Sequence, residues 1–173
     1  MNIKTSWTFR LQIHISGEFT VISFLTDLFT NKVFVSAGSG WFVAQLVKVI
    51  IDSIRDGFSV KRLVGGGGMP STHSSLVTGL FISTGIVYGV SSFEFVIAFF
   101  FAMVVMYDAM GVRLSTGKEA HILNKLRQRD LAENKEPLFD KDLDEKMGHT
   151  FPEIVAGVIT GTICAVVVCL IIL

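Results

Sequence analysis

The sequence predicts an all-α integral membrane protein: a helical bundle with about four transmembrane helices and an N-terminal interfacial or re-entrant helix. Half of the 173 residues are hydrophobic and the mean hydropathy is +0.58, which is too apolar for a soluble domain of this size. Several segments approach the roughly 20 residues that a helix needs to cross about 30 Å of hydrocarbon. Two polar stretches, residues 52–72 and 111–152, separate these segments.

The apolar segments give the elements in order. The short segment 19–29 is interrupted by Thr26 and Asp27, and it is expected to form the interfacial or re-entrant helix. Only Ser91 and Ser92 separate the second and third spans, so these two spans should form a tight antiparallel hairpin. The four expected spans are Val33–Ile51, His73–Val90, Phe93–Met110 and Glu153–Leu173.

The basic residues predict the orientation of the bundle. With four spans, both polar stretches lie on one side of the membrane, and together they carry eleven Lys and Arg residues, against three (Lys4, Arg10 and Lys32) on the other side. The positive-inside rule then predicts a multi-pass protein of the cell membrane with its motif-bearing loops in the cytoplasm. Within the second stretch, residues 118–133 are expected to form a surface helix and residues 134–146 a charged loop.

Lys48 is an ionisable residue inside an apolar span. Such a residue is a functional candidate, although a lysine one turn from the polar end of a helix also snorkels to the interface. Arg55 follows seven positions later on the same helical face. Two cations stacked in this way repel each other unless an anion lies between them.

The stretch GGGGMPSTHSS, residues 65–75, has features of an anion site. Consecutive glycines let backbone amides approach a ligand. Ser71 or Thr72 can cap the following helix, and the free amides at a helix start favour phosphate. His73 would lie in the first turn, beside the anion. A flexible loop followed by an ordinary helix cap explains the same residues equally well.

Two further clusters each allow two interpretations. Asp108 and Arg113 lie at the same polar face, where they either form an ion pair or present a guanidinium to a phosphoryl group. Thr150-x-x-Glu153 is a capping box at the start of the last span. Alternatively, Glu153 orients the imidazole of His149, and the sequence does not decide between these two uses.

Taken together, GGMPSTHSS, YDAMGVRLSTGKEAHILNKL and MGHTFPEIVAGVITG resemble the divergent PAP2 family of bacterial membrane proteins. This family is distantly related to acid phosphatases and vanadium-dependent haloperoxidases. The resemblance covers roughly residues 24–173, which implies one membrane domain after an N-terminal extension, residues 1–23. The parent fold has six core helices, more than this chain provides, which leaves room for a homodimer.

The parent phosphatases carry three motifs, and this chain matches them in part. Lys48 and Arg55 keep the six-residue spacing of the first motif, with Asp56 in place of its proline. The second motif, Pro-Ser-Gly-His, is similar to residues 70–73, with Thr72 in place of glycine. His149 and Glu153 match the His and the acid of the third motif, with Glu for Asp, whereas its Ser-Arg pair is replaced by Asp142 and Leu143.

The resemblance implies phosphoryl transfer with no metal and no cofactor. His149 would attack phosphorus while Glu153 holds its other ring nitrogen. His73 would protonate the leaving oxygen and then activate water. A site at the membrane surface suggests a lipid phosphate or prenyl diphosphate as substrate. The residues expected to bind the phosphoryl oxygens are Lys48, Arg55, Arg113, Gly68, Ser71 and Thr72, with Asp108 in a supporting position.

Two other functions compete with phosphatase activity. In the first, the chain retains an ancestral anion pocket that only binds, scaffolds or moves a phospholipid. A metal site formed by His73, Asp108, His149 and Glu153 is disfavoured, because the tight His and Cys ligand spacing of such sites is absent. No nucleic-acid partner is expected, and the net charge of +0 gives no indication of one.

Overall fold

The computed structural model describes residues 21–57 and 67–172, and these two ranges contain helices and loops but no strand. The predicted extension up to residue 20, together with Lys61, Arg62 and the first two glycines of the glycine run, lies outside the described residues. The elements in order are α1 (Val21–Thr30), α2 (Lys32–Asp56), α3 (Thr72–Tyr88), α4 (Phe93–Met110), α5 (Val112–Ala132), α6 (Phe151–Val167) and a π-helical turn, η2 (Val168–Ile172).

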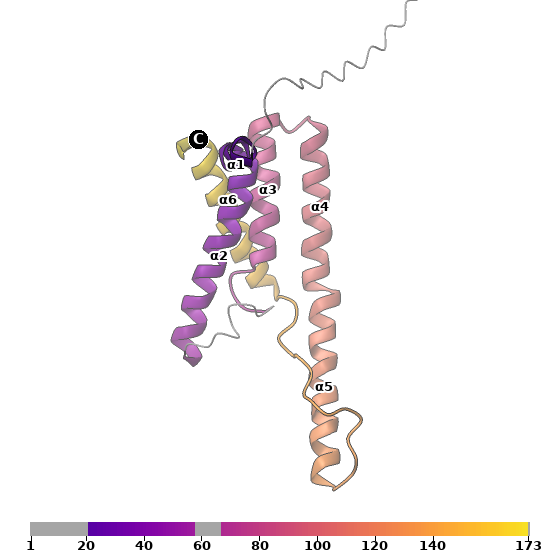
Figure 1. Cartoon of the computed structure of the whole chain (residues 1–173). Helices are drawn as coiled ribbons and strands as arrows, with labels where there is room; N and C mark the ends of the chain where they lie inside the picture. The colour runs from indigo at the N-terminus through magenta and orange to yellow at the C-terminus, as the bar shows by residue number, and fades with distance from the viewer. Residues whose placement is uncertain (1–20, 58–66, 173) are drawn as a thin grey trace, which may run out of the picture.

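Helices α2, α3, α4 and α6 run side by side in a bundle with α3 at its centre, in contact with the other three (Figure 1). The chain alternates in direction from each of these helices to the next. Residues 67–71 and the long connection from α5 to α6 therefore lie at the same end of the bundle, as the sequence predicts. The α3–α4 connection and the C-terminus lie at the other end.

Three of the four expected spans are long and apolar enough to cross a membrane: Lys32–Arg55, the region of Phe93–Ala132, and Phe151–Ile171. The fourth, α3, has only 17 residues. It also brings a set of small polar residues into the centre of the bundle. The buried ones are Thr72, Ser74, Ser75, Thr78, Ser83 and Thr84.

Small residues bring α3 and α6 into close contact. A Cβ atom added at Gly161 would overlap the backbone oxygen of Ser75, and one added at Gly157 would lie 2.5 Å from the backbone oxygen of Ser71. At the same place α2 joins the contact, because the Ser75 hydroxyl donates a 2.7 Å hydrogen bond to the backbone oxygen of Gly40. Such contacts replace the hydrophobic effect, which does not drive helix association within lipid.

Helix α1 is the expected short N-terminal helix. Its ten residues extend about 15 Å, which is too short to cross a bilayer. It lies across the end of the bundle opposite the polar loops (Figure 1). None of its residues is buried.

The helix expected over residues 118–133 is present and largely exposed, but it begins six residues earlier than predicted. Helix α5 begins at Val112 and continues the line of α4 away from the bundle (Figure 1). The helical hydrogen bonds run through Gly111: its N–H donates to Tyr107 O at 2.8 Å, and Ser115 N–H donates to Gly111 O at 3.0 Å. The two helices therefore form one nearly continuous rod.

Candidate functional site

His149 lies immediately before α6 and is only 2% exposed. One carboxylate oxygen of Glu153, Oε2, lies 3.2 Å from His149 Nδ1 and accepts the backbone N–H of Thr150 at 3.0 Å. Glu153 therefore caps the helix and holds the imidazole at the same time, and the two uses that appeared to compete coexist. A proton on Nδ1 directed at this carboxylate leaves a lone pair on Nε2.

The structure brings His73 and His149 together although 76 positions separate them in the chain. Their ring centroids are 6.1 Å apart, with the rings tilted by 59°. Backbone hydrogen bonds fix the segments that carry them: His149 N–H donates to Ala109 O, and Ser71 N–H donates to Glu153 O, both at 3.0 Å. The starts of α3 and α6 are thus tied directly to each other.

The residues before His73 are placed differently from the expected phosphate contacts. Ser71 is the N-cap of α3, and its side chain accepts the Ser74 N–H at 3.3 Å. Ser71 and Thr72 are both buried. Because the Ser71 amide already donates to Glu153 O, it does not point freely at an anion in this arrangement.

Lys48 is 2% exposed and lies on α2 beside the glycine run. A Cβ atom added at Gly68 would lie 3.2 Å from Lys48 Cε and 3.6 Å from Asp52 Oδ2. The carboxylates that act electrostatically on Lys48 are those of Asp52 and Glu153. Asp52 therefore supplies a negative charge beside Lys48, and it lines the same cavity as Arg55. Its position four residues after Lys48, on the same helical face, is the sequence signal that could have identified it.

A cavity of about 330 Å³ opens between the end of α2, the glycine run and the start of α6. Its polar walls carry two acids and two bases. One member, Lys146, was not predicted from the sequence, where it is one of many charges in a loop. The lining residues are Asp52, Arg55, Gly67, Gly68, Leu114, Lys146, Met147, Gly148, Thr150 and Glu153.

Arg113 forms an ion pair with Asp108 through its Nε atom, which confirms the simpler interpretation of these two residues. Arg113 does not line the cavity. Both residues nevertheless act electrostatically on His73, as do His149 and Lys48. The Arg113 guanidinium, which was expected to bind a phosphoryl group, is therefore held by a carboxylate near His73.

Burial dominates the chemistry of His149. It lowers the pKa of the imidazole below its usual value, and the hydrogen bond and charge of Glu153 oppose this effect. The Nε2 atom is buried and has no hydrogen-bond partner within the described part of the chain. Burial therefore favours the neutral form of this imidazole, against the opposing effects of Glu153 and the Gly68 backbone.

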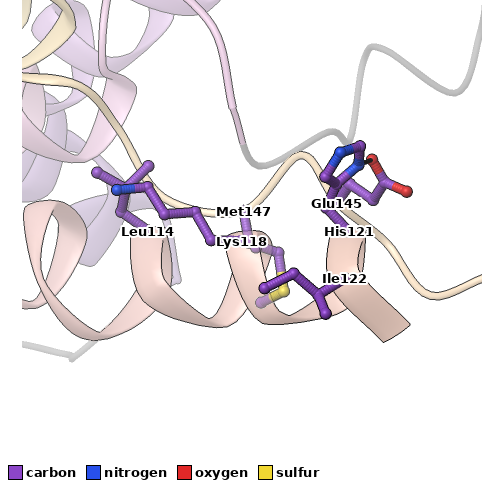
Figure 2. Close-up of a pocket in the computed structure, with 7 residues that line it drawn as sticks. Leu114, Lys118, His121, Ile122, Glu145 and Met147 are labelled. Carbon is purple, nitrogen blue, oxygen red and sulfur yellow. Dashed lines mark hydrogen bonds and ion pairs between the residues drawn. The ribbon is translucent and has the colours of Figure 1, made fainter. Parts of the chain in front are cut away.

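A second cavity, of about 400 Å³, is lined by residues of α5 and of the connection that follows it (Figure 2). His121, which the sequence leads us to expect in solvent, is exposed there and pairs with Glu145 at 2.6 Å. Hydrogen bonds from Asn124 and His121 hold the pKa of Glu145 below its usual value. Across residues 21–57 and 67–172, no group of three or more His, Cys, Asp or Glu residues is arranged to hold a metal ion.

Comparison with known proteins agrees with this architecture. The Divergent PAP2 family matches residues 29–164. The chain is 32% identical over 156 residues to the "Uncharacterized membrane protein YuiD" of Bacillus subtilis (strain 168), and the match covers 82% of this chain and 96% of the relative. No solved structure matches. From the extent of these two matches, the chain belongs to the divergent PAP2 family.

Proposed function

We propose that this membrane protein is a phosphatase that hydrolyses a lipid phosphate or prenyl diphosphate through a phosphohistidine, without a metal ion. The observation that supports this most is the histidine pair. His149 has Nδ1 directed at Glu153, and its ring lies 6.1 Å from that of His73. A nucleophile oriented by a carboxylate, with a second titratable group beside it, is the arrangement that covalent phosphoryl transfer needs.

The reaction has two steps. In the first, the Nε2 lone pair of His149 attacks phosphorus, the bond from phosphorus to the leaving oxygen breaks, and His73 gives that oxygen a proton. In the second, His73 takes a proton from water, the water oxygen attacks phosphorus, and the P–N bond breaks. Its electron pair returns to Nε2, and inorganic phosphate leaves.

The cavity supplies the charges for the phosphoryl group. Arg55 and Lys146 line it, and Lys48 lies behind Gly68. The carboxylates of Asp52 and Glu153 balance part of this charge, which suits a polyanion that must bind and leave. The cavity lies at the polar end of the bundle, and the eleven basic residues of the polar stretches favour a cytoplasmic location for that end.

A non-catalytic role in binding, scaffolding or moving a phospholipid is the second candidate. Two observations favour it. The Nε2 atom of His149 is covered, so catalysis requires a local opening that connects it to the cavity. The third motif also lacks its Ser-Arg pair, and Arg113 is bound to Asp108.

Phosphate release separates the two candidates. The full-length protein, purified in detergent, is offered a panel of lipid phosphates and prenyl diphosphates, and inorganic phosphate is measured. Release above that of a mock purification supports the phosphatase. No release from any member of the panel, together with intact binding of anionic phospholipid vesicles, supports the binding role.

The pH profile is expected to reflect the buried nucleophile. His149 must be neutral to attack, and burial lowers its pKa, so the acid limb of kcat/KM should lie below about 6.5, the usual value for histidine. Glu153→Gln removes a charge that raises this pKa, so the limb should move to still lower pH while the plateau falls. A limb that moves to higher pH would contradict an action of Glu153 on His149.

Lys146→Ala is expected to raise KM by about tenfold with a smaller change in kcat, because a charged contact to phosphate is worth roughly 1.5–3 kcal/mol. The matched control is Lys141→Ala, an exposed lysine in the same connection that does not line the cavity. Lys146→Arg should recover most of the binding. Equal KM values for the two alanine variants would remove Lys146 from the anion site.

A further inference from the structure

The connection from the tip of α5 to His149 folds back along α5. The second half of this connection packs against the helix over its whole length. The buried residues of α5 are Gly117, Ala120 and Asn124, which lie on one face of the helix. A Cβ atom added at Gly117 would lie 2.8 Å from the backbone oxygen of Glu145 and 3.0 Å from that of Met147. The returning backbone therefore lies directly against this face.

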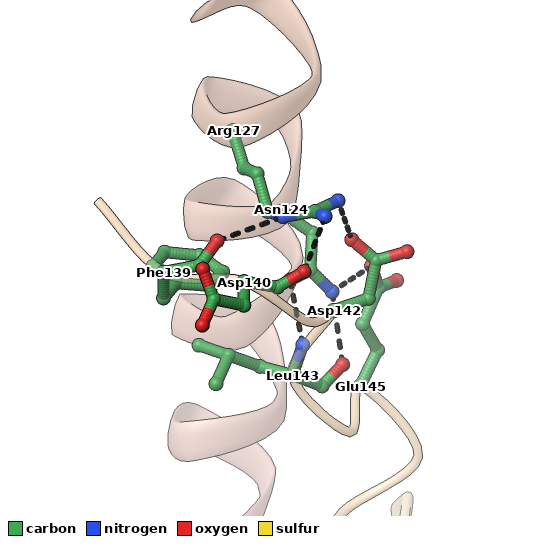
Figure 3. Close-up of polar contacts among 7 residues, drawn as sticks. All are labelled: Asn124, Arg127, Phe139, Asp140, Asp142, Leu143 and Glu145. Atoms are coloured by element: carbon green, nitrogen blue, oxygen red, sulfur yellow. Dashed lines mark hydrogen bonds and ion pairs between the residues drawn. The ribbon is translucent and has the colours of Figure 1, made fainter. Parts of the chain in front are cut away.

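Asn124 is the centre of this docking (Figure 3). Its side chain is 3% exposed and binds one residue from both sides: Leu143 N–H donates to Oδ1 at 2.8 Å, and Nδ2 donates to Leu143 O at 2.9 Å. The second Nδ2 hydrogen bond goes to Glu145 Oε1 at 2.8 Å. The Asn124 amide thus pairs with both backbone groups of Leu143, as a residue of a neighbouring β-strand would. This pairing fixes the register of Leu143 on α5.

Arg127 holds the connection one turn further out. Its guanidinium donates to Phe139 O at 3.0 Å, to Asp140 O at 2.6 Å and to the Asp142 carboxylate at 2.9 Å (Figure 3). This arginine therefore anchors the part of the connection nearest the tip.

The contacts continue towards the site in antiparallel order. Gly148 has a φ of +76° and packs so closely on α5 that a Cβ atom would overlap the backbone of Leu114. The next residue, His149, donates its N–H to Ala109 O. Positions 127, 124, 117, 114 and 109 of the α4–α5 rod thus contact progressively later residues of the connection.

From this register we infer that Asn124 is a positioning residue for His149. It fixes residues 143–145 on α5, and only three residues then separate Glu145 from His149. The position of the connection along α5 determines where the imidazole meets His73 and Glu153. Asn124 fixes that position from more than three helical turns away. The inference concerns the placement of His149; only its kinetic test rests on the proposed function.

Hydrogen–deuterium exchange of the intact protein in detergent tests the placement without any substrate. In Asn124→Ala, the Leu143 N–H and C=O lose their partners, so exchange of the amides in residues 143–149 should accelerate by roughly ten- to a hundred-fold. Gln128→Ala is the matched control, an exposed amide residue one turn away on α5, and should leave these amides unchanged. Arg127→Ala should accelerate exchange at residues 139–142 and leave His149 protected.

Kinetics then separate positioning from simple loss of stability. In Asn124→Ala, His149 becomes more hydrated, while Glu153, Lys48 and His73 still act on it, so the acid limb of kcat/KM should move up towards the usual histidine range. An unstable but correctly placed site would lose active protein with no such movement.

Two results would overturn the inference. One is an unchanged exchange rate at His149 in Asn124→Ala. The other is accelerated exchange combined with an unmoved acid limb. If Asn124→Ala does not fold, Arg127→Ala is compared with Gln128→Ala. Docking in register requires Arg127→Ala to lose protection first at residues 139–142, and equal exchange in the two variants would contradict it. Absence of wild-type activity would contradict the proposed function, whereas the exchange result still decides the placement.

Discussion

His149→Ala is expected to lower phosphate release at least about 100-fold, measured on the best wild-type substrate, because it removes the proposed nucleophile that forms the covalent intermediate. His73→Ala should lower the rate by about 100- to 10,000-fold, since it removes a general acid and base. The two variants should also differ in which step they block. The p-nitrophenolate leaving group of an activated phosphate ester needs no proton. With such a substrate, His73→Ala should release a burst of one equivalent of p-nitrophenolate and trap the phosphohistidine, whereas His149→Ala should give no burst.

His121→Ala is the control for these variants. His121 is exposed on α5 and pairs with Glu145, and it does not line the cavity between α2, the glycine run and α6. The His121→Ala variant should therefore retain most of the phosphatase activity. If His149→Ala hydrolyses the substrate as well as the wild type does, the phosphohistidine mechanism is wrong. Covalent phosphate on a residue other than His149 would also contradict this mechanism.

Gly161→Ala is expected to destabilise the bundle by about 1–3 kcal/mol, because the added Cβ overlaps Ser75 O and would lie 3.0 Å from Gly79 N. Backbone atoms of a neighbouring helix cannot rotate away, so α3 and α6 must separate. The change is measured as a fall in the midpoint of thermal unfolding in detergent. The separation should also loosen the Ser71–Glu153 hydrogen bond that ties the two helix starts together.

Gly38→Ala provides the matched comparison. Gly38 lies within α2, and a Cβ atom there would meet nothing within 4 Å. Alanine favours a helix over glycine by roughly 0.5–1 kcal/mol, so this midpoint should stay or rise. Equal midpoints for the two variants would show that α3 and α6 are not packed backbone to backbone.

The sequence predicts the helices well because apolarity and local caps determine them. Helix α4 has the predicted limits, with Ser92 capping its start and Gly111 following its end. By contrast, α2 continues to Asp56, beyond the predicted Ile51, because loss of apolarity marks the edge of the lipid rather than the end of a helix. The direction of α5 depends on whether hydrogen bonds pass through a single glycine, which composition does not reveal.

In the candidate site, too, local sequence indicates the contacts between residues close in the chain but not those between distant residues. The four-residue spacing of His149 and Glu153 suggested their pairing as one of two alternatives, as did the proximity of Asp108 and Arg113 in the chain. Both pairs form in the structure. The approach of His73 to His149 was proposed from the family resemblance, because no local rule connects them. Lys146 was missed because its place beside Gly67 depends on how the long connection docks on α5.

The rod formed by α4 and α5 has a consequence for how the protein meets its membrane. Its 40 residues extend about 60 Å, twice the thickness of the hydrocarbon. The far end of α5 therefore stands roughly 30 Å beyond the hydrocarbon boundary, several Debye lengths at physiological ionic strength. Charges near Arg129 and Lys135 are consequently screened from the lipid headgroups, whereas cations near the base of the rod, such as Lys146, experience the surface potential of the bilayer.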